Sequence, residues 1–396
     1  MKSAEDKKLE ALVAEIELPD GAYDKAVTRY EDLGEWFNRD GSSVKRYDPR
    51  ISPQGSFALG TAIYPLNRTD DYDLDLTCKL QIGITRASHS QYQVKDMVRQ
   101  ELELYRTARK IQEPLEEMRR CWRLQYKDSP GFHLDTVPGI PTEDARRTVL
   151  EQQIRAQGVP GHLTSDLAAE AIWITDNRSA SYKALSPDWL SSNPAGYARW
   201  FQARLTGFPL LAEAQAKVDD MPVYRRKTPL QKVIQLLKRH RDVMFERVPD
   251  AKPISVIITT LAARHYRPGE SLAESMNTVL RGLNEFRRSD SNVVLNPVNP
   301  EENFADKWTM PEYEKLRLKQ NFHMWVEQAT TDFARYAAAA SAIKLAESAA
   351  TSLKVTPTAD RLAVAFGSAA LAAAPAVHTP PHVEIQPQPP RPWQKG

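Results

Sequence analysis

Two spacings of apolar residues divide the first part of the chain. Residues 3–18 and 21–40 carry apolar side chains at every third or fourth position, and the Pro-Asp-Gly sequence at 19–21 interrupts the pattern. This spacing predicts two helices joined by a break. Residues 72–82, "YDLDLTCKLQI", instead alternate apolar and polar side chains, which is typical of a β-strand. The chain therefore begins with helices and then enters a sheet.

Further elements follow from the same patterns. Residues 88–111 have helical spacing, and the runs 121–127 and 132–140 are short and strand-like. The sequence Asp-Ser-Pro-Gly at 128–131 separates these two runs and has the composition of a turn, so it predicts a hairpin in the same sheet. Residues 141–221 are expected to be irregular, with short helical stretches and turns.

The second half of the chain is predicted to be mostly helical. Thr228 and Pro229 have the residue types of an N-cap and a first helical position, and an apolar stripe follows from Leu230. The opposite face of this helix is basic. Further helical patterns extend through residues 254–353. From about residue 371 the chain is rich in proline, which predicts a disordered tail at 371–396.

Composition excludes several classes of protein. Lys and Arg number 53 and Asp and Glu 51 among 396 residues, so only a local patch of charge would favour nucleic acid. No apolar run reaches the roughly 20 residues of a membrane span, and the N-terminus is too charged for a signal peptide, so we expect a cytoplasmic protein without a membrane partner. Cys78 and Cys121 are expected to be reduced, and two cysteines do not predict a zinc site.

Three acidic residues at alternate positions raise a question of charge. Asp71, Asp73 and Asp75 would lie on one face of the predicted strand, and Asp135 interrupts the apolar pattern of another strand. A solvated acidic strand edge is one interpretation of this pattern. Carboxylates that converge from two strands are also suited to Mg²⁺ or Mn²⁺, which prefer oxygen ligands and phosphate.

A Gly-Ser turn upstream supplies a second part of such a site. Backbone N–H groups around Gly55, together with the hydroxyl of Ser56, are suited to hold a phosphate. A phosphate-binding turn beside a divalent cation indicates phosphoryl or nucleotidyl transfer. In that chemistry Asp135 would bind the cation that activates the attacking hydroxyl.

These residues resemble a known family. The ordered motifs "GSFALGT", "DYDLDL" and "FHLDTVP" are similar to the signature of DNA-polymerase-β-like nucleotidyltransferases. More narrowly, they resemble the bacterial relatives of cyclic GMP-AMP synthase and oligoadenylate synthase, the CD-NTases of anti-phage signalling. Later segments such as "TPLQKVIQLLKRHRD", "ISVIITTLAARHY" and "NPVNPEENFADKW" extend the resemblance over most of residues 54–308.

The resemblance implies an α+β fold with a nucleotidyltransferase core packed against a helical, oligoadenylate-synthase-like domain. We place the core at 48–220 and the helical domain at 221–370, with an N-terminal helical segment, 1–47, that packs on both. The active site would lie in the cleft between the two domains.

The resemblance also implies roles for particular residues. Asp73, Asp75 and Asp135 would be catalytic and bind the metal, while Asp71 falls outside the family's usual pair and is left near or outside the site. The residues expected to contact nucleotide are Gly55, Ser56, Lys238, Ser255 and Asn303.

Lys238 and Ser255 also fit purely structural roles. Lys238 lies in a basic run, which is commonly a solvated helix face, and Ser255 has the residue type of an N-cap, a role compatible with anion binding. We interpret His133 as an ordinary strand residue and assign His240 no special role.

The main functional hypothesis is a Mg²⁺-dependent enzyme that makes a cyclic di- or trinucleotide second messenger from ATP and other NTPs. The messenger would act on a downstream effector in bacterial anti-phage signalling. A linear oligonucleotide or terminal transferase is the alternative within the superfamily, and a nucleotide-binding regulatory scaffold is the alternative outside enzymes. The tail ending in Gly396 suggests a ubiquitin-transfer-like partner or no role at all.

Overall fold

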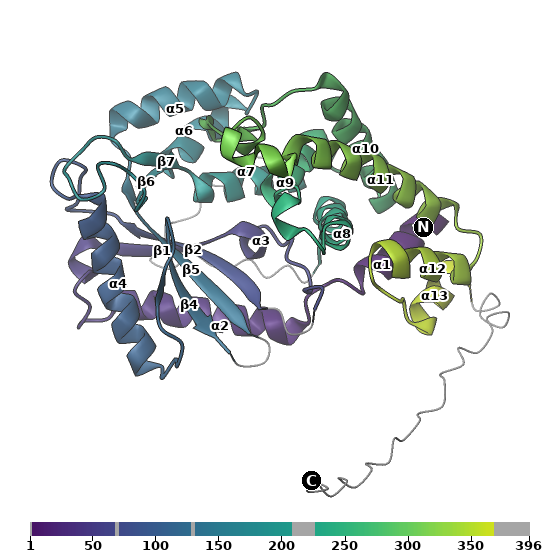
Figure 1. Ribbon diagram of the computed structural model, residues 1–396, viewed down its shortest axis with the longest axis horizontal. Coiled ribbons are helices and arrows are strands. Elements are labelled where there is room, and N and C mark those ends of the chain that lie inside the picture. Colours follow the sequence, from purple (N-terminus) through teal and green to yellow (C-terminus); the bar gives the residue numbers. More distant parts are fainter. Residues whose placement is uncertain (1, 68–70, 128–130, 208–225, 368–396) are drawn as a thin grey trace, which may run out of the picture.

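A computed structural model describes residues 2–67, 71–127, 131–207 and 226–367 (Figure 1). The expected turn at 128–130, the end of the expected core at 208–220 and the expected tail at 371–396 lie outside these ranges. Among the described helices, none combines the length and the apolar character needed to cross a membrane.

A mixed β-sheet forms the centre of one half of the molecule. Its path runs β1-β2-β5-β4-β3, with β6 paired to β5 and β7 paired to β6. Strands β2 and β5 are parallel, and the other pairs are antiparallel. The strands are β1 (Pro49–Gln54), β2 (Tyr72–Leu80), β3 (Glu116–Glu117), β4 (Trp122–Tyr126), β5 (Phe132–Pro141), β6 (Ile172–Ile174) and β7 (Leu190–Ser192), and a separate hairpin is formed by β8 (Leu295–Asn296) and β9 (Asn299–Asn303).

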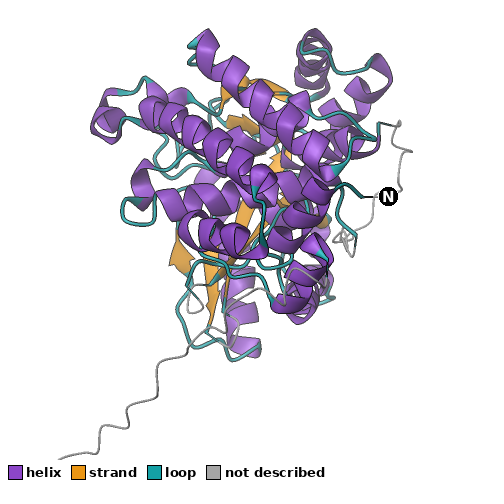
Figure 2. Ribbon diagram, turned by 90° about the vertical axis from the view of Figure 1, so that its right-hand side faces the viewer, coloured by secondary structure: helices purple, strands orange, loops and turns teal. Residues whose placement is uncertain are grey.

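Helices surround the sheet and make up most of the second half (Figure 2). The α-helices are α1 (Ala4–Val13), α2 (Asp20–Asn38), α3 (Gly55–Ala58), α4 (Gln91–Ala108), α5 (Asp144–Ala156), α6 (Gly161–Ala169), α7 (Pro194–Thr206), α8 (Pro229–Met244), α9 (Ser255–His265), α10 (Leu272–Ser289), α11 (Leu318–Ala338), α12 (Ala342–Ser352) and α13 (Ala359–Phe366). Short 3₁₀ helices lie at Lys45–Tyr47, Pro249–Ala251, Asp306–Trp308 and Pro311–Leu316.

The predicted start of α8 is confirmed. Thr228 is the N-cap, its hydroxyl accepts a hydrogen bond from the backbone N–H of Gln231, and the side chain of Gln231 binds back to the Thr228 N–H. Pro229 occupies the first helical position, where a missing N–H costs nothing. The helix therefore begins where its sequence satisfies the free N–H groups of its first turn.

The basic face of α8 differs from the expectation of a solvated surface. Lys238, Arg239, His240 and Arg241 are all buried, although their charges would favour water. They are buried because α8 lies in the middle of the molecule, where the loop after α3 covers one side and α11 another (Figure 1). His240, for example, lies with Nε2 3.0 Å from Oδ2 of Asp332 on α11, which is a structural contact.

Two apolar cores hold the molecule together. One lies between the sheet, α2 and α4, and the other collects side chains from α1, α5, α6, α7 and α8–α12. The N-terminal segment thus contributes α1 to the second core and α2 to the first. Residues 141–206, expected to be irregular with short helical stretches, contain α5, α6 and α7, whose apolar residues join the second core.

Candidate active site

Adjacent parallel strands bring the predicted acidic residues together. In the register of β2 and β5, Asp75 lies directly opposite Asp135, and Asp73 lies opposite His133. Asp73, Asp75 and Asp135 share one face of the sheet because alternate residues of a strand point to the same side. The expected convergence of carboxylates from two strands is therefore present in the fold.

The Gly-Ser turn lies directly beside these carboxylates. Gln54, the last residue of β1, pairs with Asp75, so α3 begins at Gly55 next to the Asp75 carboxylate. Gly55 has φ +65°, and a Cβ atom at this position would lie 2.2 Å from Oδ2 of Asp75. Glycine is required here both by the backbone conformation and by the close approach of the carboxylate.

Asp75 is in an unfavourable electrostatic environment. Burial raises the pKa of Asp75 to about 7, and the negative charges of Asp73 and Asp135 contribute to this rise, against the opposing effects of Arg123 and Lys238. Ionised carboxylates on neighbouring positions of paired strands repel one another unless a cation lies among them. Asp75 is therefore poised to gain stabilisation from a bound cation.

Asp135 has a partner that the sequence analysis missed. Arg123 on β4 lies opposite Asp135 and donates two hydrogen bonds of 2.7 Å to it, from Nε to Oδ1 and from Nη2 to Oδ2. This bidentate geometry is the strongest arrangement of an Arg–carboxylate pair. Both oxygens of Asp135 are thus occupied by the guanidinium group.

This ion pair bears on metal binding. Among the described residues, no three His, Cys, Asp or Glu side chains are placed so that they would hold a metal ion as they stand. The side chain of Asp73 is 67% exposed, and Arg123 engages Asp135. The donor chemistry and the repulsion around Asp75 fit a divalent cation, but Asp135 would be available as a further ligand only without its bonds to Arg123.

Asp71 lies beside the site, which is one of the two positions left open for it. Its Oδ2 atom is 2.8 Å from Nε2 of His133 and accepts a 3.1 Å hydrogen bond from Nε2 of Gln125. The other ring nitrogen of His133 is 3.6 Å from Oδ1 of Asp73. His133 is a strand residue, as predicted, and its ring also links Asp71 to Asp73, so Asp71 supports the site through its neighbours.

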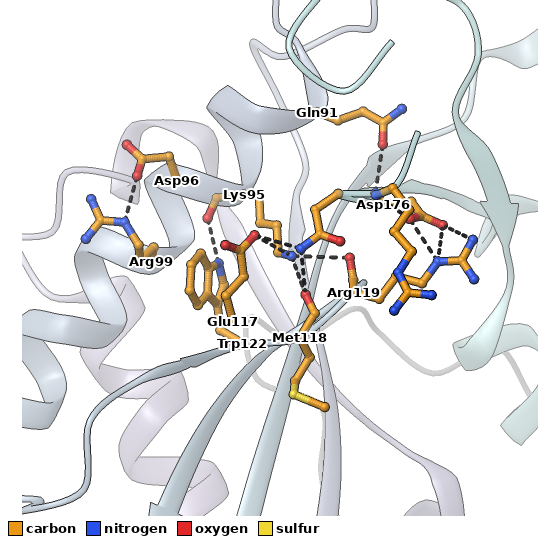
Figure 3. Close-up of polar contacts among 11 residues, drawn as sticks. Gln91, Lys95, Asp96, Arg99, Glu117, Met118, Arg119, Trp122 and Asp176 are labelled. Carbon is orange, nitrogen blue, oxygen red and sulfur yellow. Dashed lines mark hydrogen bonds and ion pairs between the residues drawn. The ribbon is translucent and has the colours of Figure 1, made fainter. Parts of the chain in front are cut away.

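A buried lysine fixes the segment that leads into β4 (Figure 3). Nζ of Lys95 on α4 donates to Oε1 of Glu117 at 3.0 Å and to the carbonyl oxygens of Met118 and Arg119 at 2.6 and 3.2 Å. The indole N–H of Trp122 donates to the Lys95 carbonyl at 2.9 Å. These bonds hold the start of β4, and with it the position of Arg123 one residue later.

A cavity of about 890 Å³ opens between the sheet and the helices. Asp71, Asp73 and Asp75 line it from the sheet side, together with Gly55 and Ser56. The residues that face them from the helical side include Lys238, Arg241, Lys252, Ser255, Asn296, Glu302 and Phe304. The sheet side is thus acidic. The helical side carries three cations, Lys238, Arg241 and Lys252, which we call the basic wall, but it also carries Asp242, Glu246 and Glu302. Asp242 pairs with both Arg241 and Lys252, so Lys238 is the cation of this wall without a carboxylate partner among the described residues.

The basic wall is organised by α8. Nζ of Lys238 donates a 2.8 Å hydrogen bond to the Thr61 carbonyl, and burial together with the charge of Arg241 lowers the pKa of Lys238 to about 8. Arg241 donates at 2.7 Å to the hydroxyl of Ser255. Ser255 is the first residue of α9 and Ile254 is its N-cap, so the N-cap alternative for Ser255 is wrong.

Asn303 is placed away from the cavity lining. Its Oδ1 accepts hydrogen bonds from the N–H groups of Val294 and Ala305 at 2.8 and 3.1 Å, and its Nδ2 donates to the Asn292 carbonyl at 3.1 Å. All of its polar atoms thus hold the β8–β9 hairpin. The structure does not support a direct nucleotide contact for Asn303, and its neighbour Glu302 faces the cavity instead.

Two missed residues had a signal in the sequence. Arg123 follows from the predicted hairpin, because pairing across a turn centred on 129 places residue 123 opposite 135. Arg241 lies three residues after Lys238 and therefore on the same helix face. Glu302 had no such signal, because its position depends on how the β8–β9 hairpin docks.

Comparison with known proteins identifies the family. A family model described as the nucleotidyltransferase domain of DncV-like cyclic GMP-AMP synthases matches residues 49–138. A c-di-GMP synthase of Roseivirga ehrenbergii is 31% identical over 330 residues, which cover 81% of this chain and 76% of that protein. The chain belongs to the CD-NTase family. As a CD-NTase it is a nucleotidyltransferase that makes a cyclic oligonucleotide.

Other relatives agree with this CD-NTase assignment. The cyclic dinucleotide synthase CdnG of Bradyrhizobium diazoefficiens is 26% identical over 343 residues, covering 80% of this chain and 73% of that protein. The structure of CdnG in complex with GTP matches with a TM-score of 0.59 at 21% identity, over 93% of this chain and 98% of that one. Vibrio cholerae DncV, solved with a linear intermediate, matches with a TM-score of 0.54 at 13% identity, over 89% and 95%. The α+β fold expected for this CD-NTase is confirmed.

Proposed function

We propose that this enzyme uses Mg²⁺ to join NTPs, with GTP among them, into a cyclic di- or trinucleotide. The observation that carries the proposal is a cavity with Asp73 and Asp75 on the sheet side and Lys238, Arg241 and Lys252 on the helical side. A cyclic dinucleotide is the better supported product, because relatives named as c-di-GMP and cyclic dinucleotide synthases align over most of the chain.

Residues of the basic wall would bind the donor triphosphate. Lys238 and Arg241 supply positive charge from α8, the Ser255 hydroxyl supplies a hydrogen bond, and Gly55 and Ser56 approach from the opposite side. A triphosphate bound in this way would hold its α-phosphate toward the carboxylates of β2. The attacking hydroxyl of the second nucleotide would then lie between Asp75 and Asp135.

Asp73, Asp75 and Asp135 would hold Mg²⁺ once Arg123 releases Asp135. When bound, the ion supplies charge neutralisation for the triphosphate and lowers the pKa of the attacking hydroxyl. Once free of Arg123, Asp135 would also accept the proton of that hydroxyl. The freed guanidinium group of Arg123 remains beside the site, where it offsets the negative charge that the three carboxylates concentrate.

Incubation of the full chain with four labelled NTPs and Mg²⁺ or Mn²⁺, followed by phosphatase and mass spectrometry, tests the proposal. Phosphatase-resistant cyclic products are expected. Linear ladders would instead indicate a terminal transferase, and no turnover would favour a regulatory scaffold. The Asp73→Asn, Asp75→Asn double variant should lose roughly 1,000-fold or more in rate, while Asp144→Asn, an exposed change on α5, should keep full activity.

We further propose that the product acts on an effector in bacterial anti-phage signalling, as the family resemblance suggests. A related CD-NTase, CdnC of E. coli, has been solved in complex with a HORMA protein, which supports a protein partner in regulation. Phage challenge of cells that carry the whole operon should show protection that the double variant loses. A ubiquitin-transfer-like partner would conjugate the C-terminus of the chain to other proteins. Tail-linked adducts in those cells would support this, and their absence would remove it.

A further inference from the structure

Glu302 is an acidic residue at the substrate cavity that has a spare acceptor. It lines the cavity from β9, and its Oε2 accepts a 2.8 Å hydrogen bond from Nδ2 of Asn296. Within the described residues, its Oε1 accepts no hydrogen bond and the carboxylate forms no ion pair. Burial raises the pKa of Glu302, against the effects of Asn296 and Arg120. Glu302 is partly buried, and a ligand in the cavity would be able to donate hydrogen bonds to its carboxylate in place of water.

The orientation of Glu302 is fixed by its surroundings. Oδ1 of Asn296 accepts a 3.0 Å hydrogen bond from the Val298 N–H, so the amide must present Nδ2 to Glu302. The hairpin itself is held against β7 and the start of α7, because Nδ2 of Asn193 donates to the Val298 carbonyl at 3.0 Å and Nδ2 of Asn299 donates to the Ser191 carbonyl at 3.0 Å. Glu302 is therefore held in place before any ligand binds.

Aromatic side chains flank this carboxylate in the cavity. Phe304, two residues further along the chain, and Tyr197 on α7 both line the cavity, with ring centroids 6.0 Å apart and an interplanar angle of 82°. The Tyr197 hydroxyl lies 2.8 Å from that of Thr260, which fixes the ring. A flat aromatic ligand could stack on such a surface while its edge reaches Glu302.

We propose that Glu302 selects guanine by accepting hydrogen bonds from its N1–H and N2–H groups. The inference rests on the proposed function and names the residue that chooses the base. Each carboxylate oxygen has two lone pairs, so Oε2 is able to accept a second bond beside that from Asn296. Among the four common bases, guanine alone presents two adjacent donors on its Watson–Crick edge. Adenine and cytosine each place an acceptor beside their amino group, and that acceptor would face the carboxylate unfavourably.

Binding of 2′,3′-dideoxynucleotides to the full chain with Mg²⁺ tests this assignment without turnover, because these probes lack the attacking hydroxyl. Calorimetry should show ddGTP binding about tenfold more tightly than dideoxyinosine triphosphate, which lacks only the N2 amino group, and more tightly still than ddATP. In Glu302→Gln the affinity for ddGTP should fall roughly tenfold or more, and its preference over the inosine analogue should shrink to within about twofold.

Two further variants control for folding and charge. Glu301→Gln removes a carboxylate from the adjacent residue, which pairs with Arg146 at 2.6 Å, and it should keep the wild-type preference. Glu302→Asp keeps the charge on a shorter side chain and should retain a reduced preference for ddGTP over the inosine analogue. This outcome separates base reading from a merely structural role of Glu302.

Equal binding of ddGTP and the inosine analogue by the wild type, or an unchanged preference in Glu302→Gln, would overturn the inference. Absence of binding by all three probes would also overturn it. Guanine-selective binding that depends on Glu302, in a protein that forms no cyclic product in the NTP assay, would contradict the proposed function alone.

Discussion

At the scale of single residues, Gly55 and Asp75 depend on each other. Replacement of Gly55 by alanine places a methyl group against the Asp75 carboxylate and also forces a side chain into a conformation with positive φ. We expect Gly55→Ala to lose roughly 100-fold in activity, because the carboxylate must move by about 1 Å. Gly158→Ala is the matched control, since Gly158 has φ +78° and a Cβ atom there would have no neighbour within 4 Å. Similar activity in the two variants would contradict the steric argument.

The raised pKa of Asp75 predicts a pH-dependent change in stability. The folded protein raises this pKa from 3.8 to about 7, so ionisation of Asp75 opposes folding, and the penalty grows as the pH rises from 3.8 to about 7. In EDTA, Asp75→Asn should therefore melt roughly 2–4 °C above the wild type near pH ~8, and the difference should vanish in acid, near the unfolded-state pKa. Calorimetric melting curves measure this, with Asp144→Asn, an exposed change, expected to show no such trend. If the variant and the wild type had the same melting temperature at both pH values, ionisation of Asp75 would carry no cost to the stability of the fold.

At the scale of elements, the segment between α4 and β4 determines where Arg123 lies. Lys95 is fully buried, and its ammonium group satisfies two backbone carbonyls as well as Glu117 (Figure 3). Lys95→Met should lower the free energy of unfolding by about 2–4 kcal/mol, because those carbonyls lose their donor. It should also reduce catalytic activity, since β4 carries the partner of Asp135.

Arg99 provides the comparison for this prediction. It lies on the same helix and pairs with Asp96 at 2.7 Å, but its side chain is 40% exposed. Arg99→Met should change stability by less than about 0.5 kcal/mol, because an exposed pair contributes little. Denaturant titrations of the two variants would measure both values, and equal effects would show that burial of Lys95 is not what matters.

The hairpin β4–β5 and the strand β2 show how far elements were predictable. Their alternation of apolar and polar residues predicted the strands, and the facing of Asp75 and Asp135 follows once β2 and β5 pair. Short helical stretches were predicted within residues 141–221, but the bounds of α5, α6 and α7 were not, because their apolar faces meet the distant helices of the second core. Such a partner is not visible in a local pattern.

At the scale of the whole molecule, α8 joins the two halves through Lys238. Its ammonium group reaches the Thr61 carbonyl beside the sheet, and its pKa is lowered to about 8 by burial and by Arg241. A triphosphate would favour the charged form, so the affinity for ddGTP should fall as the pH rises through this pKa. We expect about a fourfold loss between roughly pH 7.0 and 8.5 relative to Lys238→Arg, which stays charged over this range. Parallel pH profiles of the two proteins, measured by calorimetry, would contradict this.

The sequence by itself determined the local structure and the chemical identity of the acidic side of the site. Strand alternation, the Gly-Ser turn and the N-cap of α8 depend on neighbouring residues, so the sequence predicts them without a fold. The motifs also carried the family resemblance, and with it the expected roles of Asp73, Asp75 and Asp135.

Only the tertiary structure decided which groups meet across the cavity. Packing between segments far apart in sequence pairs Arg123 with Asp135 and buries the basic run of α8. It also places Glu302, and not Asn303, in the cavity lining. Whether a charged or polar side chain needs a protein partner depends on its burial, because a buried group has lost water as the alternative partner. Burial is set by the tertiary structure.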